Sequence, residues 1–238
     1  MMRSSVMSSF PSPDMLQALQ ARIGYQFQDQ RLLERALTHS SHADGTRPDQ
    51  DNERLEFLGD RVLGLLTAEY LIESYPEERE GPLARGLNQL VNRKACAQVA
   101  RACGLGEALR MSRSEAKSGG RDKTSILGDA CEALLGAMYQ DGGLPAVRAF
   151  YRRFWADIPV TLAADPKTEL QEWVQGRGQE IPTYTLASRD GPDHEPVFTV
   201  SVTIGAETYK GTGRNKQAAE RKAAQAALAG LNHQKDAE

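Results

Sequence analysis

Two stretches of the sequence combine an apolar helical pattern with paired carboxylates, and they constrain the fold more than any other feature. In residues 52–66 (NERLEFLGDRVLGLL), apolar side chains recur every three or four positions, which predicts an amphipathic helix. Glu53, Glu56 and Asp60 lie three and four positions apart, so the helix places their carboxylates on one face. Like charges at this spacing repel one another by roughly 0.2–0.5 kcal/mol per pair. Taken alone, the triplet also fits a solvated acidic face.

A second apolar run, residues 125–138 (SILGDACEALLGAM), carries Asp129 and Glu132 on one helical face, and no Lys or Arg lies within residues 126–138. Buried carboxylates without partners cost several kcal/mol each, so they pair, become protonated or bind metal. Two such helices facing each other would form an all-oxygen site for a hard cation such as Mg²⁺ or Mn²⁺. The candidate metal ligands are Glu56, Asp60, Asp129 and Glu132. A di-iron helical bundle would instead need Glu-x-x-His pairs, and the four histidines stand in no such spacing.

The first two thirds of the chain show helical patterns that are separated by Gly, Pro and Asn/Asp clusters. The predicted helices are Asp14–Ile23, Gln30–Thr38, Asn52–Ser74, Glu80–Cys103, Lys123–Tyr139 and Leu144–Ala156. The polar segment Arg110–Arg121 is predicted to be a loop, and no strand pattern is convincing in this part. Residues 158–166 contain two prolines and several small residues, which is typical of a linker.

The pattern changes after this segment. Residues 198–204 alternate between apolar and polar side chains, which predicts a strand. Asn215 is a good N-cap for the alanine-rich helix that follows it. The predicted elements are a helix at Lys167–Gln175, strands at Pro182–Arg189, Phe198–Ile204 and Glu207–Gly211, and a helix at Lys216–Leu231. We therefore expect an all-α domain at residues 15–157, a linker at 158–166 and a small α+β domain (α-β-β-β-α) at 167–232.

The two acidic runs resemble the signature of the ribonuclease III family. NERLEFLGD is similar to that family's signature motif, and ILGDACEALLGAMYQDGG is similar to its second acidic helix. The flanking segments Ala36–Ser40 and Glu80–Arg85 also resemble the family pattern, and the resemblance extends from about Leu16 to Leu231. Two departures occur: Gly128 stands where alanine is usual, and Pro82 interrupts the Glu-Gly segment. Neither departure affects an acidic position.

The second domain resembles a double-stranded-RNA-binding domain. Its most specific motif is GTGRNKQAA at residues 211–219, where Gln217 replaces a usual lysine and so removes one cation. The resemblance implies that the start of the last helix binds phosphates and that the first helix and the loop Gly191–His194 contact minor grooves. The implied RNA-binding residues are Gln171, Glu172, His194, Asn215 and Lys216.

These resemblances imply a nuclease with an all-α catalytic domain, in which Asp60 and Glu132 are the catalytic residues we expect to be least dispensable. We expect a Mg²⁺-dependent endoribonuclease, with Mn²⁺ as a substitute, that cleaves double-stranded RNA to 5′-phosphate and 3′-hydroxyl ends. Ribosomal RNA precursors and some mRNAs are the expected substrates. The family resemblance also implies a homodimer with Phe57 at its interface. The alternative is a non-catalytic RNA-binding protein, which would be expected to have lost at least one acidic ligand; all four are present.

Composition agrees with a cytoplasmic protein that has no membrane partner. The 238 residues include three cysteines without a C-x-x-C motif, which indicates buried thiols in a reducing compartment. No run of about 18 apolar residues predicts a membrane span, and the first dozen residues lack the apolar core of a secretion signal. Residues 1–14 and 233–238 are predicted to be disordered tails. The net charge of −3 is unusual for an RNA-binding protein, but residues 208–223 carry five basic residues against one acid.

Overall fold

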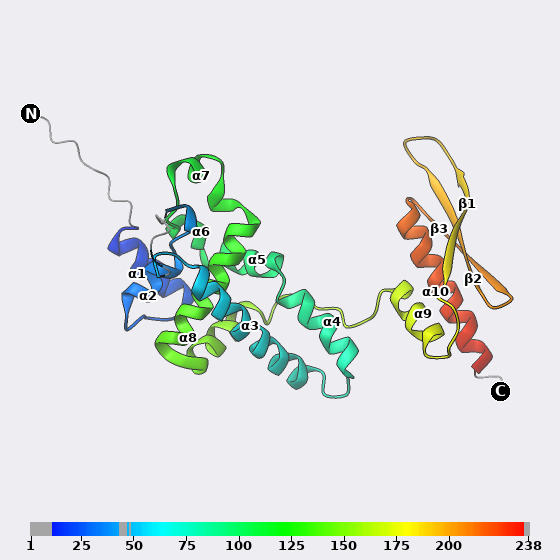
Figure 1. Cartoon of the computed structure of the whole chain (residues 1–238), viewed down its shortest axis with the longest axis horizontal. Coiled ribbons are helices and arrows are strands. Elements are labelled where there is room, and N and C mark those ends of the chain that lie inside the picture. The colour runs from blue at the N-terminus through cyan, green and yellow to red at the C-terminus, as the bar shows by residue number, and fades with distance from the viewer. Residues whose placement is uncertain (1–10, 43–46, 48, 236–238) are drawn as a thin grey trace, which may run out of the picture. The chain divides into compact units, whose positions relative to one another are not determined.

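The computed structural model describes residues 11–42, 47 and 49–235, and it divides into two compact units, one ending at Leu162 and the other beginning at Ala163 (Figure 1). Most of the two predicted tails, at residues 1–14 and 233–238, lies outside the described residues. No helix in the described part of the chain is long and apolar enough to cross a membrane.

The first unit is helical, and its two longest helices, α3 and α8, pack against each other in its core (Figure 1). Leucines of both helices form part of this core: Leu63 of α3 and Leu134 and Leu135 of α8 are fully buried. The helices are α1 (Pro13–Ile23), α2 (Gln30–Ala36), α3 (Glu53–Ser74), α4 (Glu80–Leu90), α5 (Arg93–Cys103), α6 (Leu105–Ala108), α7 (Arg113–Lys117) and α8 (Thr124–Phe154), with short 3₁₀ turns at Ser40–His42 and Gly120–Asp122.

The prediction of one helix from Glu80 to Cys103 was wrong, because the segment forms α4 and α5 with a break between them. Asn92 lies at the break, where its side-chain oxygen accepts hydrogen bonds from the backbone amides of Lys94 (2.9 Å) and Ala95 (3.0 Å). This is the geometry of an N-cap, which satisfies amides that the new helix leaves without partners. The break therefore starts α5 at Arg93.

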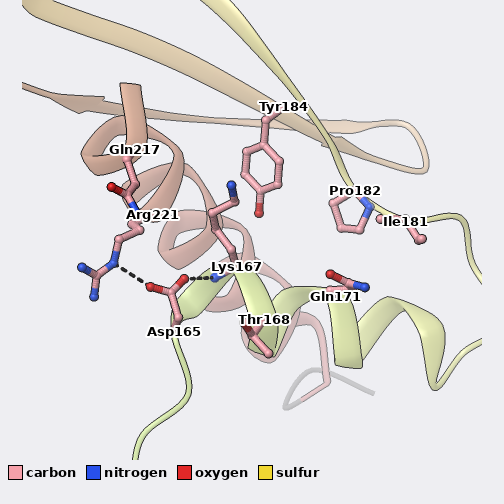
Figure 2. Close-up of a pocket in the computed structure, with 9 residues that line it drawn as sticks. All are labelled: Asp165, Lys167, Thr168, Gln171, Ile181, Pro182, Tyr184, Gln217 and Arg221. Carbon is pink, nitrogen blue, oxygen red and sulfur yellow. Dashed lines mark hydrogen bonds and ion pairs between the residues drawn. The ribbon is translucent and has the colours of Figure 1, made fainter. Parts of the chain in front are cut away.

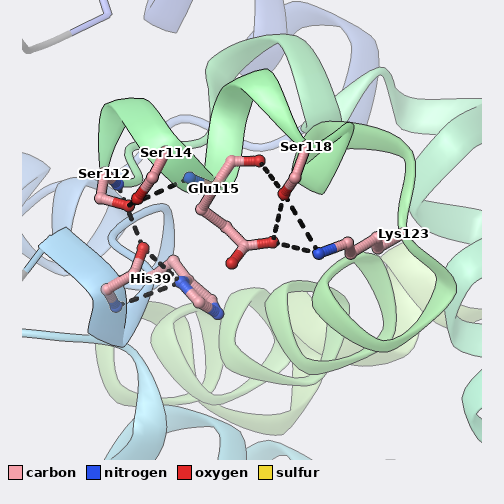
Figure 3. A network of polar contacts seen from close by, with 7 residues as sticks. His39, Ser112, Ser114, Glu115, Ser118 and Lys123 are labelled. Atoms are coloured by element: carbon pink, nitrogen blue, oxygen red, sulfur yellow. Dashed lines mark hydrogen bonds and ion pairs between the residues drawn. The ribbon is translucent and has the colours of Figure 1, made fainter.

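The predicted loop Arg110–Arg121 contains the short helix α7, so that prediction was wrong in part. The hydroxyl of Ser112 caps α7 by accepting a hydrogen bond from the amide of Glu115 (3.2 Å), and the carboxylate of Glu115 pairs with Lys123 (Figure 3). On the other side, the hydroxyl of Ser41 accepts from the amide of Ser112 and contacts Nδ1 of His39. Polar contacts within the segment and to Ser41 thus hold a segment whose sequence shows no apolar period.

The helix α8 is interrupted at Gly143, whose φ of 67° and ψ of −170° are not helical. The two predicted helices Lys123–Tyr139 and Leu144–Ala156 correspond to its two halves. Just before the interruption, the carboxylate of Asp141 accepts hydrogen bonds from the hydroxyl of Tyr25 and from the amides of Gln28 and Asp29, at 2.7–2.9 Å. Asp141 therefore fixes the connection between α1 and α2 to α8.

The first half of segment 158–166 packs against the helical unit. Ile158, Val160 and Leu162 contact its core, and the side chain of Arg85 donates a hydrogen bond to the carbonyl of Leu162 at 3.1 Å. The side chain of Gln89 donates to the carbonyl of Thr161 at 2.7 Å. The chain is therefore tied to α4 as far as Leu162.

The second unit is a three-stranded antiparallel sheet with its last helix packed on the sheet and its first helix packed against the last, which confirms the predicted fold class (Figure 1). The strands lie side by side in the order β1-β2-β3, with a register shift between Leu186 and Ser188 in β1. Val202 of the sheet, Leu170 of the first helix and alanines of the last helix form its core. The elements are α9 (Pro166–Gln175), β1 (Thr183–Asp190), β2 (Val197–Ile204), β3 (Glu207–Gly213) and α10 (Lys216–Lys235).

Candidate active site

Two glycines allow α3 and α8 to cross with their backbones in direct contact. A Cβ atom added at Gly59 would lie 1.7 Å from the carbonyl oxygen of Glu132, and one added at Gly136 would lie 2.1 Å from that of Leu55. Both distances are far below van der Waals contact, so neither position has room for a side chain. Because the acidic residues lie beside this crossing on both helices, the close approach brings the two acidic faces together.

The acidic residues of both helices line one open hollow of about 490 Å³. The residues around it are Glu53, Glu56, Phe57, Asp60, Asp129 and Glu132. The structure therefore brings together all four residues that the sequence indicated as metal ligands, two from each helix. Glu53, which the helical spacing placed on the same face, also lines the hollow.

The carboxylates in the hollow perturb one another. Burial and the neighbouring Asp60 carboxylate raise the pKa of Glu132 to about 7, although the thiol of Cys96 opposes this by donating a hydrogen bond to Oε1 of Glu132 at 3.6 Å. Burial also raises the pKa of Glu56, and the charges of Asp129 and Glu53 act in the same direction. The hollow thus holds more negative charge than its surroundings neutralise.

Two arginines contact the acidic cluster. Nε of Arg93, the first residue of α5, lies 3.3 Å from Oδ1 of Asp129, and the Arg61 guanidinium pairs with its sequence neighbour Asp60. Burial raises the pKa of Asp129, while Arg93 opposes the shift. The absence of Lys and Arg within residues 126–138 therefore does not leave Asp129 without a cation, because the fold supplies one from another helix. Sequence reasoning missed both Arg93 and Cys96.

The donor set fits a hard divalent cation, because four carboxylates offer only oxygen atoms. The uncompensated charge expressed in the raised pKa of Glu132 is what such a cation would offset. The side chains are not grouped around an ion, however: no three His, Cys, Asp or Glu residues in the described part of the chain are arranged to hold one. Asp60 and Asp129 each pair with an arginine, which gives a physical reason why the four carboxylates line one hollow without converging on a common point.

Phe57 lies at the edge of the hollow and points away from the core of its own unit. Its side chain is 68% exposed, and the guanidinium of Arg61 lies 5.3 Å from the centre of its ring. Leu65 and Ile72, eight and fifteen residues further along α3, are 49% and 61% exposed. At 100° per residue, the three side chains fall within an arc of about 80° on the helix. We call Phe57, Leu65 and Ile72 the α3 stripe.

The predicted RNA-binding residues of the second unit lie on exposed positions of three elements. Gln171 and Glu172 are exposed on α9, and Gln171 lines a hollow of about 320 Å³ together with Lys167, Gln217 and Arg221 (Figure 2). Ion pairs join Arg221 to Asp165 (2.9 Å) and Lys167 to Glu220 (2.6 Å), which hold the start of α9 against α10. Glu172 and His194 do not line this hollow.

The start of α10 and the loop between β1 and β2 are neighbours in space. Asn215 caps α10 as predicted, since its side-chain oxygen accepts a hydrogen bond from the amide of Ala218 at 2.8 Å. Lys216, the first residue of α10, is exposed beside it. A guanidinium nitrogen of Arg214 lies 4.0 Å from the carboxylate of Glu195, which follows the exposed His194. Asn215, Lys216 and His194 therefore belong to adjoining segments of one surface.

Known proteins resemble both units. Residues 29–158 match the family model described as ribonuclease-III-like, and residues 166–231 match the double-stranded RNA binding motif. The chain is 54% identical over 215 residues to Ribonuclease 3 of Phenylobacterium zucineum (strain HLK1), with 88% of this chain and 90% of the relative covered. It is 52% identical over 215 residues to Ribonuclease 3 of Caulobacter vibrioides (strain NA1000 / CB15N), with 88% and 93% covered.

Among solved structures, the chain is similar to the nuclease domain of ribonuclease III from Campylobacter jejuni. The two share 38% sequence identity with a TM-score of 0.58, over 61% of this chain and 99% of that domain. That structure is described as having structural flexibility in a region involved in dimer formation.

Proposed function

The chain belongs to the ribonuclease III family, and from this premise we propose that it cleaves double-stranded RNA with the help of Mg²⁺, leaving 5′-phosphate and 3′-hydroxyl ends. Family membership makes it an endoribonuclease, and the double-stranded RNA binding motif agrees with a duplex substrate. The observation that carries the proposal is the meeting of four carboxylates from α3 and α8 in one hollow.

In the proposed site, Glu56, Asp60, Asp129 and Glu132 would hold Mg²⁺ or its substitute Mn²⁺. A divalent cation bound there would lower the pKa of water and neutralise charge on the scissile phosphate. Asp60 and Glu132 are the proposed catalytic residues. Among charged groups, Asp60 contributes most to the raised pKa of Glu132. These two residues therefore concentrate negative charge at one point, which is where a cation gains most by binding.

We also propose a homodimer, in which the α3 stripe of each copy contacts the other. One acidic hollow can cut one strand, so cleavage of both strands of a duplex needs two hollows, which a two-fold dimer supplies. The exposure of Phe57 beside the hollow supports this arrangement, because an aromatic side chain in that position gains by covering its ring.

Residues 167–232 are proposed to hold the duplex, and residues 15–157 to cut it. The amides at the start of α10, next to Asn215 and Lys216, suit a phosphate group. Gln171, Glu172 and His194 are proposed to contact minor grooves, where the shape of the duplex and its 2′-hydroxyls are read.

We propose ribosomal RNA precursors and some mRNAs as substrates, and the cytoplasm as the location. The three buried free cysteines suit its reducing conditions.

The test is incubation of the full-length protein with a long duplex RNA, with the two separated strands as controls. We expect cleavage of the duplex in Mg²⁺, none in a chelator, and products that begin with a 5′-phosphate and end with a 3′-hydroxyl. Cleavage in the chelator, a preference for single strands or products with cyclic phosphate ends would each contradict the proposal.

A further inference from the structure

A glycine in the acidic helix makes room for an arginine from another helix. A Cβ atom added at Gly128 would lie 2.7 Å from Cγ of Arg93 and 3.1 Å from its carbonyl oxygen, so a larger residue would displace the Arg93 side chain. With glycine at this position, the Arg93 side chain lies against Gly128 and places its Nε 3.3 Å from Oδ1 of Asp129. The departure from alanine at position 128 is therefore coupled to the ion pair.

Arg93 combines a backbone that is held in place with a side chain that is largely exposed to solvent. The Asn92 cap holds the start of α5, and the following residues Ala95 and Cys96 are buried in the core. The Arg93 side chain is 62% exposed, whereas that of Asp129 is 26% exposed. Its charge acts on Glu56 as well as on Asp129. The guanidinium thus acts on two of the four proposed ligands from the rim of the hollow.

We propose that Arg93 competes with the divalent cation for Asp129 and thereby sets the metal affinity of the site. The inference rests on the proposed role of the four carboxylates as metal ligands. While the ion pair is formed, the Asp129 oxygen that faces the guanidinium is not available to a metal ion. A cation that enters must displace Arg93 or bind close to a positive charge, and either costs free energy. The competition explains why the acidic residues lie together without being grouped around an ion.

The test measures Mn²⁺ binding to the full-length protein by calorimetry without RNA, so that it does not depend on cleavage. Arg93→Gln should tighten binding by roughly threefold to tenfold, because one positive charge near the ion is removed. Gly128→Ala keeps the charge but displaces the side chain, and it should shift affinity in the same direction. If both act through the same ion pair, the double variant should bind no more tightly than Arg93→Gln alone.

Two controls separate this inference from the proposed function. Lys94→Gln removes the same charge from the next residue on the exposed face of α5, and we expect its affinity to equal that of the wild type. Glu132→Gln should weaken binding strongly; if it does not, the proposed metal site itself is wrong. If Glu132→Gln loses binding while Arg93→Gln binds as weakly as the wild type or more weakly, the site stands and the competition is refuted. Additive effects of Arg93→Gln and Gly128→Ala would also refute it.

Discussion

The carboxylate of Glu132 is placed where the proposed function needs a negative charge, and this placement lowers the stability of the fold. This carboxylate lies among three others, and burial together with Asp60 raises its pKa to about 7. Ionisation at this position therefore costs free energy in the metal-free protein. Residues that destabilise a fold in this way persist where function requires them.

Glu132→Gln should lose most of its cleavage activity. The amide has nearly the shape of the carboxylate but lacks its charge, so cleavage in Mg²⁺ should fall below roughly a tenth of the wild-type rate. Affinity for duplex RNA should change little, because the second unit is untouched. Gel-shift titration in Ca²⁺ and single-turnover cleavage in Mg²⁺ measure the two effects. A variant that retains most of its cleavage would remove Glu132 from the proposed site.

The same substitution should stabilise the metal-free protein at alkaline pH. A raised pKa means that the folded state binds more protons than the unfolded state between about pH 4.5 and 7, so stability falls as pH rises through this window. Glu132→Gln removes this loss. It should raise the free energy of unfolding at pH 8 by about 1–2 kcal/mol, after allowance for solvent screening of a partly exposed group. Urea unfolding at pH 8 and pH 5 in a chelator measures it. An equal effect at both values of pH would contradict the explanation.

Sequence spacing predicted the acidic residues that meet in the hollow, because the helical period fixes which side chains share a face. It could not predict Arg93 or Cys96 as their neighbours. Those contacts depend on where α5 packs against α8, and residues 36 positions apart carry no local signal of it. The one trace in the sequence was Gly128, whose missing side chain makes room for Arg93.

The crossing of α3 and α8 is the feature of the elements on which the hollow depends. Gly136→Ala would place a methyl group 2.1 Å from the carbonyl oxygen of Leu55 and force the helices apart. We expect a loss of about 1–3 kcal/mol or more in the free energy of unfolding. Cleavage should fall further than stability alone explains, because the carboxylates on the two helices separate. Urea unfolding and cleavage assays well below the melting temperature measure the two effects.

Gly81→Ala is the matched control for the crossing. Gly81 also lies in a helix, but a Cβ atom there would meet only a side-chain atom of Arg85, at 3.7 Å. Alanine favours helix by up to about 1 kcal/mol over glycine, but the ring of Pro82 disfavours a helical alanine just before it, so the stability of this variant should stay within about 1 kcal/mol of the wild type. If Gly136→Ala and Gly81→Ala had the same free energy of unfolding and the same cleavage rate, the crossing would not need a glycine at position 136.

Helix boundaries show why local patterns give the elements only in part. The apolar period runs through Glu80–Cys103 with no proline after Pro82 in the first turn, yet the Asn92 cap divides the segment into α4 and α5. A single asparagine within a helical pattern is ordinary, and only tertiary packing turns it into a cap. In residues 110–121 the reverse holds, since α7 has no apolar period and is held by the polar network around Ser112.

At the scale of the molecule, the exposed α3 stripe predicts how copies associate. Phe57→Ala should weaken the proposed dimer at least about tenfold, since a central aromatic anchor contributes ~2 kcal/mol or more. The stability of the folded monomer should change little, because Phe57 is 68% exposed and not part of its core. Sedimentation at several concentrations and thermal melts separate the two effects.

Ile181→Ala is the control, because it removes an exposed apolar side chain from the second unit and should leave association unchanged. An undisturbed dimer would exclude Phe57 from the interface.

Truncation of the chain after the first unit tests what the second unit contributes. A chain that ends at Leu162 retains the contacts of Val160 and Leu162 with α4 and should fold, whereas one that ends at Pro159 loses them and should be less stable. The longer fragment should cleave poorly at physiological salt and better at low salt, because it lacks the phosphate contacts proposed for Lys216 and its neighbours.

Counterion release makes the logarithm of affinity fall linearly with the logarithm of salt concentration, in proportion to the number of phosphates contacted. The fragment that ends at Leu162 should therefore show a shallower slope than the full chain. In the full chain, Lys216→Gln should reduce the slope by about one unit, which tests the same contact without removing a folded unit. If the fragment binds duplex RNA with the affinity and salt slope of the full chain, residues 167–232 do not hold the substrate. If only Lys216→Gln is without effect, the unit holds the RNA through other residues.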